Sequence, residues 1–121
     1  MSSRSPSEIY GPGIWILIHY KSLKTNTQQE KEEFKKFIED IKNMFPCENC
    51  VKHLETFCKI HPFENYEGVV NREGTDLGLF QWAWTLHNSV NIRLGKKRVD
   101  FDTAYSMFKN KSLTCHSKCD I

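Results

Sequence analysis

The chain has 121 residues with 39% hydrophobic and 26% charged side chains, a composition that suits one compact domain and excludes a disordered chain. Its 17 Lys and Arg residues nearly balance 15 Asp and Glu residues, and the net charge of +2 argues against nucleic-acid binding through bulk charge. No apolar signal peptide opens the chain, and its longest apolar run, Ile14 to Ile18, cannot span a bilayer, so we expect a cytoplasmic protein that is neither secreted nor inserted into a membrane.

Two helices are expected in the first third of the chain. Residues 1–8 form a serine-rich, flexible N-terminus, and Pro12 can then begin a helix that covers residues 14–23. Thr27 and Glu30 form a capping-box pattern for a second helix, which Pro46 ends. The apolar residues of the second helix repeat at helical spacing: Phe34, Phe37, Ile38, Ile41, Met44 and Phe45.

The rest of the chain predicts three more helices. One follows Cys47 and ends near Pro62, after which a polar loop runs to residue 74. A fourth helix is expected from residue 75 to residue 94, stopped by Gly95, and a short fifth from residue 102 to residue 109. Since no segment alternates as a strand does, we predict an all-α fold, a four-helix bundle plus a short fifth helix. The domain covers residues 9–110, and a cysteine-containing tail covers residues 111–121.

Cys47 and Cys50 form a C-x-x-C motif at the expected start of the third helix. A helix N-terminus stabilises a thiolate, and two cysteines at this spacing lie within disulfide reach, so the motif favours a reversible redox pair. The alternative is a zinc-binding interaction module without catalysis, in which His53 and the tail group Cys115-His116-Cys119 would complete the ligand set.

Polar residues on the fourth helix favour the redox interpretation over zinc. His87, Asn88 and Asn91 lie within two turns, and at least two of them share the stripe expected to face the core. Buried polar groups need partners, so a polar ligand inside the bundle is expected. Trp15 and His19, one turn apart on the first helix, add an indole and an imidazole. Together these side chains suit a large planar ligand with phosphates beside a dithiol, a description that FAD meets.

Three motifs in this order resemble the Erv/ALR family of FAD-linked sulfhydryl oxidases. They are Trp15-x-x-x-His19, Pro46-Cys47-x-x-Cys50, and His87-Asn88-x-Val90-Asn91-x-x-Leu94-Gly95-Lys96. The resemblance implies a helical bundle that holds FAD, with O2 as the final electron acceptor and H2O2 as product. It also implies that Cys47 meets the incoming thiol and that Cys50 lies beside the flavin. The cofactor-binding residues implied are Gly11, Trp15, His19, His53, His87, Asn88, Val90, Asn91 and Lys96, and no metal is expected.

The resemblance carries further expectations about partners and the remaining cysteines. The short form is similar to the versions encoded by large cytoplasmic DNA viruses, among them that of African swine fever virus, which implies the host cytoplasm and virus particles as locations. A homodimer and a dithiol carrier or substrate protein are implied as partners. Cys115 and Cys119 resemble a shuttle pair, with a structural disulfide as the alternative. The family staple would join Cys58 to position 84, but Trp84 stands there, so we expect the staple to be absent and Cys58 to pack as a small apolar residue.

Overall fold

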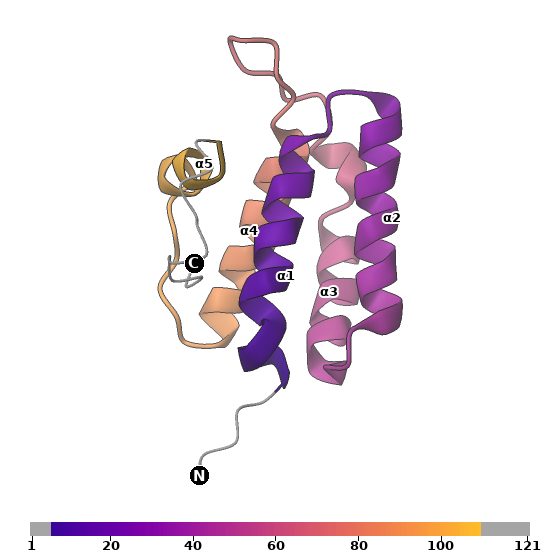
Figure 1. Ribbon diagram of the computed structural model, residues 1–121, viewed down its shortest axis with the longest axis vertical. Coiled ribbons are helices and arrows are strands. Elements are labelled where there is room, and N and C mark those ends of the chain that lie inside the picture. The colour runs from indigo at the N-terminus through magenta and orange to yellow at the C-terminus, as the bar shows by residue number, and fades with distance from the viewer. Residues whose placement is uncertain (1–5, 110–121) are drawn as a thin grey trace.

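The computed structural model describes the backbone of residues 6–109 and the side chains of residues 13–109. Within these residues the chain forms five α-helices, one short 3-10 helix and no strand. In chain order the elements are α1 (Pro6–Leu23), α2 (Gln28–Met44), α3 (Glu48–Ile60), η1 (Phe63–Asn65), α4 (Gly78–Arg93) and α5 (Phe101–Lys109). The predicted all-α class, with four longer helices and a short fifth, is confirmed (Figure 1).

The helices α1 to α4 run side by side as a bundle, and α5 lies next to α4 at the edge of that bundle (Figure 1). Like α1, which contacts α2, α4 and α5, the helix α4 has three neighbours, namely α1, α3 and α5. Its buried residues therefore lie on several sides: Gly78, Leu79, Phe80, Trp82, Ala83, Leu86, His87, Asn88 and Asn91. Among the described helices, none has the length and apolarity needed to cross a membrane.

The start of α2 follows its sequence signal, whereas the start of α1 does not. Thr27 Oγ1 accepts the Glu30 N–H at 3.1 Å and Glu30 Oε1 accepts the Thr27 N–H at 3.0 Å, which confirms the predicted capping box. The first helix begins at Pro6, where a missing N–H costs nothing, and it continues through Pro12. The predicted start at Pro12 is therefore wrong. Residues 6–8 of the expected flexible N-terminus are helical, and residues 1–5 lie outside the described part.

Two groups of apolar side chains meet at α4. In the larger group, Trp82 packs edge-to-face on Phe34 and Phe57, with ring centroids 5.9 and 5.4 Å apart. The smaller group lies between α4 and α5 around Phe80 and Phe108. Burial of such a side chain contributes about 1.5–3 kcal/mol. The larger group holds α1 to α4 together, and the smaller one attaches α5.

The loop between α3 and α4 is organised by the carboxylate of Asp76. Its oxygens accept the N–H groups of Gly68 and Gly78 at 3.0 and 2.9 Å, and Lys31 of α2 forms an ion pair with it at 3.0 Å. Burial raises the pKa of this carboxyl, but these donors outweigh it and hold the pKa below its usual value. A Cβ on Gly78 would meet the Tyr66 carbonyl, so glycine is required at the first position of α4. The predicted polar connection is confirmed, with η1 added.

The segment between α4 and α5 is fixed by side chains of α4. Gly95 ends α4 with φ +72°, a conformation that glycine adopts without strain. Further on, Val99 is held at both backbone groups: its N–H donates to Asn88 Oδ1 and its carbonyl accepts from Asn88 Nδ2, each at 2.9 Å. Trp84 Nε1 donates to the same carbonyl at 2.7 Å. The position of α5 therefore depends on two side chains of α4.

Candidate active site

Cys47 and Cys50 form a disulfide at the start of α3, with Cα atoms 5.2 Å apart. Cys47 is the N-cap of the helix, and its Sγ accepts the Cys50 N–H at 3.3 Å. The unpaired N–H groups and the dipole at a helix N-terminus favour negative charge there, so a thiolate released at this point is stabilised. Both cysteines are only partly buried. The arrangement has the geometry of a reversible dithiol–disulfide pair that a second thiol can reach.

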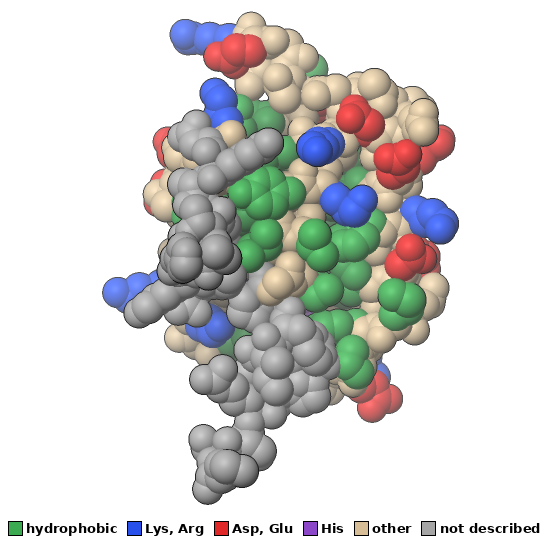
Figure 2. Space-filling view, viewed as in Figure 1, with side chains coloured by type: hydrophobic (Ala, Val, Ile, Leu, Met, Phe, Trp, Pro, Cys, Tyr) green, Lys and Arg blue, Asp and Glu red, His purple; other side chains and the backbone are tan. Residues whose placement is uncertain are grey.

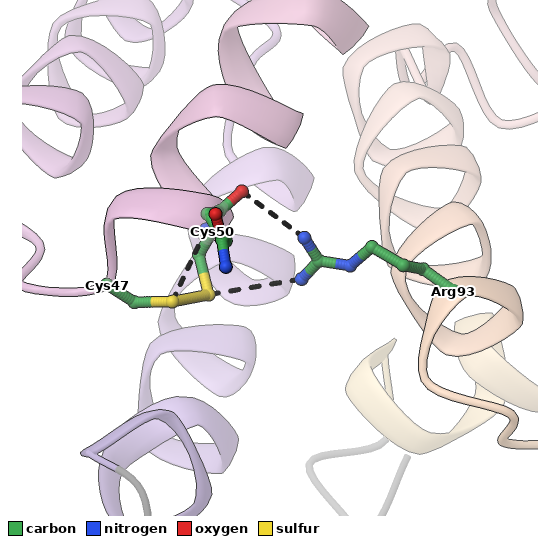
Figure 3. The surroundings of a disulfide bond; sticks show 4 residues. Cys47, Cys50 and Arg93 are labelled. Atoms are coloured by element: carbon green, nitrogen blue, oxygen red, sulfur yellow. Dashed lines mark hydrogen bonds between the residues drawn. A yellow bond between two sulfur atoms is a disulfide. The ribbon is translucent and has the colours of Figure 1, made fainter.

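Two polar contacts join α3 to α4 beside this disulfide. His53 Nε2 lies 2.9 Å from Ser89 Oγ, and because Ser89 donates its own proton to the Leu86 carbonyl at 2.7 Å, it accepts from His53. One turn further along α4, Arg93 reaches the first turn of α3 (Figure 3). Burial lowers the pKa of His53, and the charge of Arg93 lowers it further, so this imidazole is neutral at pH 7.

A stack of rings lies between α1 and α4. The indole of Trp15 is parallel to the imidazole of His87, with 3.9 Å between centroids and 3° between planes. His19 Nε2 lies 2.8 Å from His87 Nδ1, and Phe108 of α5 stacks on His19 at 4.5 Å. Burial lowers the pKa of His19 to about 3, with a smaller contribution from His87. The imidazole of His19 is therefore neutral at pH 7 where it meets His87.

Two buried polar atoms on this side of α4 have no hydrogen-bond partner within the described residues, namely His19 Nδ1 and Asn91 Nδ2. His19 is 1% exposed and Asn91 3% exposed, so bulk water does not compensate them. An unpaired buried donor or acceptor costs about 1–3 kcal/mol. Their presence beside the flat surface of Trp15 and His87 indicates a site for a planar ligand that forms hydrogen bonds.

The structure separates the residues predicted to bind a ligand into three groups. His87 and Asn91 lie on one stripe of α4, and Trp15 and His19 of α1 face it. Asn88 lies on the neighbouring stripe, and both its amide atoms are bound to Val99. The remaining predicted residues have other surroundings. His53 faces Ser89, Val90 packs against the larger core group, Lys96 is exposed after Gly95, and Gly11 is a backbone position within α1.

The implied staple between Cys58 and position 84 does not fit this fold. Trp84 points to α5, where its ring packs edge-to-face on Phe101 at 5.6 Å. Cys58 is a free thiol on α3 that packs against the larger core group and interacts with Lys42 of α2. Burial raises the pKa of the Cys58 thiol. Position 84 holds Trp rather than Cys, so the family staple is absent as the sequence indicates, and packing of Cys58 as a small side chain is confirmed.

The zinc interpretation gains no support from the part of the chain that the structure describes. Cys47 and Cys50 are joined to each other, and no group of three His, Cys, Asp or Glu side chains among the described residues is arranged to hold a metal. The other ligands that this interpretation needs, Cys115 and Cys119, lie outside the described residues. Their two alternatives, shuttle or structural disulfide, therefore stay predictions.

Sequence reasoning missed two residues that contact the predicted site. Arg93 is not a defined position of the three motifs, although its spacing of four from Ser89 places both on one face of α4. Phe108 lies beyond these motifs, yet its ring stacks on His19. The sequence signal for Arg93 is its place as a basic residue in the last turn of the fourth helix, in a chain whose third helix begins with a cysteine pair. For Phe108 it is the apolar spacing of α5.

Comparison with known proteins decides the family. The family model described as Erv1 / Alr matches residues 12–112. The chain belongs to the Erv1 / Alr family. The crystal structure of the yeast Erv1 core has this fold, with a TM-score of 0.70 and 23% identity over 90% of this chain and 88% of that chain.

Relatives of this Erv1 / Alr chain come from plants, yeast and a virus. Sulfhydryl oxidase 1 of Oryza sativa subsp. japonica is 31% identical over 88% of this chain and 19% of its own length. The mitochondrial FAD-linked sulfhydryl oxidase ERV1 of Saccharomyces cerevisiae is 32% identical over 77% of this chain and 47% of its own length. A Frog virus 3 protein named as an FAD-linked sulfhydryl oxidase is 25% identical over 82% and 65%. The chain thus spans about a fifth of the plant relative and about half of the yeast one.

Proposed function

We propose that this chain is an FAD-dependent thiol oxidase, which forms disulfides in substrate proteins through Cys47 and Cys50 and passes the electrons to O2 with formation of H2O2. The observation that carries the proposal is the disulfide at the N-terminus of α3 in a chain of the Erv1 / Alr family. The names of its relatives, as FAD-linked sulfhydryl oxidases, agree with this activity.

The residues between α1 and α4 fit FAD. The partly buried indole of Trp15, which stacks on His87, offers a flat apolar ring, and the unpaired atoms of His19 and Asn91 offer buried hydrogen-bonding groups. We therefore assign these four residues to the cofactor. Further assigned contacts, which rest on the resemblance, are Gly11, His53, Val90 and Lys96. Asn88 acts through the segment it holds at Val99.

The thiol chemistry follows from the disulfide. A substrate thiolate attacks Cys47 Sγ, the Cys47–Cys50 bond breaks, and its electron pair leaves on Cys50 Sγ. A second substrate thiolate then attacks the mixed disulfide and releases Cys47, so the substrate loses two electrons and the cysteine pair gains them. When bound, FAD supplies a two-electron acceptor that O2 can reoxidise. The protein holds both thiolates at a helix N-terminus, where they are stabilised.

A homodimer is part of the proposal. Figure 2 shows apolar side chains gathered over the side formed by α1 and α2. Leu17 of α1 is 49% exposed there, and Phe37 of α2 is only partly buried, with Lys21 over its ring. A symmetric contact between two copies through this side would cover these residues. The second proposed partner is a dithiol carrier or substrate protein.

Location and the tail cysteines complete the proposal. We assign the chain to the viral type of the family, of which the African swine fever virus enzyme is an example, and hence to the host cytoplasm and virus particles. The Frog virus 3 relative supports a viral form, whereas the yeast relative is mitochondrial. The tail pair, Cys115 and Cys119, would relay electrons from protein thiols to Cys47. Truncation after residue 113 should then slow oxidation of a protein dithiol far more than that of dithiothreitol.

The proposal is tested with the purified full-length protein. It should bind FAD, visible as flavin absorbance, and consume O2 when dithiothreitol is added. Cys47→Ser and Cys50→Ser should each retain FAD and reduce O2 consumption to the background rate, whereas Cys58→Ser should keep the parent rate. A colourless protein, or near-normal turnover by either active-site variant, would contradict the proposal. A long-wavelength charge-transfer shoulder in Cys47→Ser would place the Cys50 thiolate beside the flavin, and its appearance in Cys50→Ser would reverse the two roles.

A further inference from the structure

The guanidinium of Arg93 bridges the first turn of α3 from the last turn of α4. Its Nη1 donates to the Asn49 carbonyl at 3.2 Å, and its Nη2 lies 3.9 Å from Cys50 Sγ (Figure 3). The bond to Asn49 fixes one arm of the planar fork, so the other arm is directed at the sulfur. The position of this charge beside the disulfide is therefore set by a backbone contact as well as by the sulfur itself.

The two sulfurs of the disulfide consequently differ in their surroundings. Cys47 Sγ accepts the neutral N–H of Cys50, whereas Cys50 Sγ faces the full positive charge of Arg93. In thiol–disulfide exchange, the attacked sulfur forms the new bond and the other sulfur leaves as a thiolate. A leaving thiolate departs faster when a nearby cation lowers its proton affinity. The contact thus favours Cys50 as the leaving sulfur and Cys47 as the attacked one.

We propose that Arg93 stabilises the thiolate of Cys50 and thereby directs the incoming thiol to Cys47. This inference rests on the proposed oxidase function for its reaction, but the charge effect concerns the cysteine pair alone. In the step concerned, a substrate thiolate bonds to Cys47 Sγ, the bond between the two sulfurs breaks, and its electron pair leaves on Cys50 Sγ next to the guanidinium. No further reactant is needed.

Other titratable groups on the packed helices do not supply this charge. On α3, Glu48 is exposed in the first turn, and His53 has a pKa lowered by burial and by the charge of Arg93. On α1, His19 is buried and neutral at pH 7. On α2, Lys42 is in an ion pair with a glutamate one turn away. Arg93 is thus the cation that the described structure places in contact with the sulfur.

The test measures the proton affinity of Cys50 directly. In the reduced full-length Cys47→Ser protein, the rate of alkylation by iodoacetamide is followed against pH on the peptide that contains Cys50. Adding Arg93→Gln should raise the pH midpoint by about one unit, the lower end of the effect of an opposite charge at this distance. Arg93→Lys should restore part of the shift. The control is Arg72→Gln, in the loop at the opposite end of the bundle, which should change nothing.

The peptide that contains Cys58 serves as an internal reference, because this thiol lies on α3 away from the disulfide. Its midpoint should not move. An unchanged midpoint for Cys50 in Arg93→Gln overturns the proposal, as does an equal movement of both peptides, which would indicate general loosening of α3. With Cys47 present, Arg93→Gln should also slow dithiothreitol oxidation roughly threefold, given a Brønsted coefficient of about 0.5.

Failure of the two proposals can be told apart. If the Cys50 midpoint shifts but the protein neither binds FAD nor consumes O2, the role of Arg93 stands and the oxidase function fails. If turnover is normal and the midpoint does not shift, the oxidase function stands and the role of Arg93 fails.

Discussion

Two neighbouring stripes of α4 each carry a ring and an amide one turn apart. On only one of them do the side-chain donors and acceptors all have hydrogen-bond partners within the described residues. On the stripe that faces α5, Trp84 and Asn88 place every side-chain donor and acceptor on Val99. On the stripe that faces α1, Asn91 Nδ2 and the opposing His19 Nδ1 have no partner within the described residues. Because both stripes are buried, the difference distinguishes a structural contact from a site prepared for a ligand.

The largest expected effect comes from removing the ring at the centre of the unsatisfied stripe. His87→Ala deletes the stack on Trp15 and the hydrogen bond to His19, and should lower the free energy of unfolding by about 3 kcal/mol. The variant should also lose FAD. Since a ligand that binds only the native state stabilises it by about 2.7 kcal/mol at 100 times its dissociation constant, added FAD should raise the melting temperature of the parent more than that of the variant. Equal flavin content in both proteins would show that this stripe does not bind the cofactor.

A matched substitution on the stripe that faces α5 should act on stability, and on flavin binding only through α5. Asn88→Leu leaves the N–H and carbonyl of Val99 without the amide, at a cost of about 2 kcal/mol. The loss is measured by urea unfolding of the flavin-free protein. Flavin affinity should fall only as far as α5 loosens. A variant of parental stability would mean that the contacts to Val99 contribute nothing to attachment of α5.

Acid should lower the free energy of unfolding through His19, which lies opposite the α4 stripe that faces α1. Burial holds its folded-state pKa at about 3, below the ordinary value of 6.5, so the unfolded chain binds a proton that the folded chain excludes. The contribution of this pKa difference to the free energy of unfolding is fully present above pH 6.5. It is lost as the pH falls toward 3, with a slope of about 1.4 kcal/mol per pH unit. Urea unfolding at several pH values should show a shallower loss in His19→Gln. Parallel curves for the two proteins would exclude this contribution.

The substitution with the smallest expected effect on stability should be the one that separates flavin binding from stability most clearly. Asn91→Leu removes a buried N–H2 group that has no partner, so the flavin-free protein should keep its stability or gain up to about 1 kcal/mol. The same variant should bind FAD at least tenfold more weakly. This outcome would be opposite to that of Asn88→Leu, although both replace a buried asparagine of α4. Destabilisation of both variants to the same degree would remove the distinction between the stripes.

Sequence patterns predicted what depends on local spacing. The capping residues Thr27 and Glu30, the helical repeats and the buried position of His87 and Asn91 all follow from periods of three and four residues. The same spacing places Leu94 in line with His87 and Asn91, but Leu94 is 56% exposed because α4 ends at Arg93 and leaves it beyond the packed turns.

Contacts between distant segments could not be predicted in the same way. Asn88 and Asn91 belong to one motif, and the course of the linker after α4 brings Val99 to Asn88. The same holds for Trp84, whose ring is directed toward Phe101 of α5. Arg93 likewise acquires its contact with Cys50 only once α3 and α4 are packed together.

The ring of Phe108 on His19 makes α5 the outer wall of the space between α1 and α4. This wall is attached through a small aromatic group and through Val99 rather than through the main core. Local unfolding of such an element costs less than global unfolding, so we expect α5 to open while the bundle stays intact. If FAD binds in this space, as proposed, its release should require α5 to detach. Hydrogen exchange of the α5 amides would report how readily this wall opens, and bound FAD should slow that exchange.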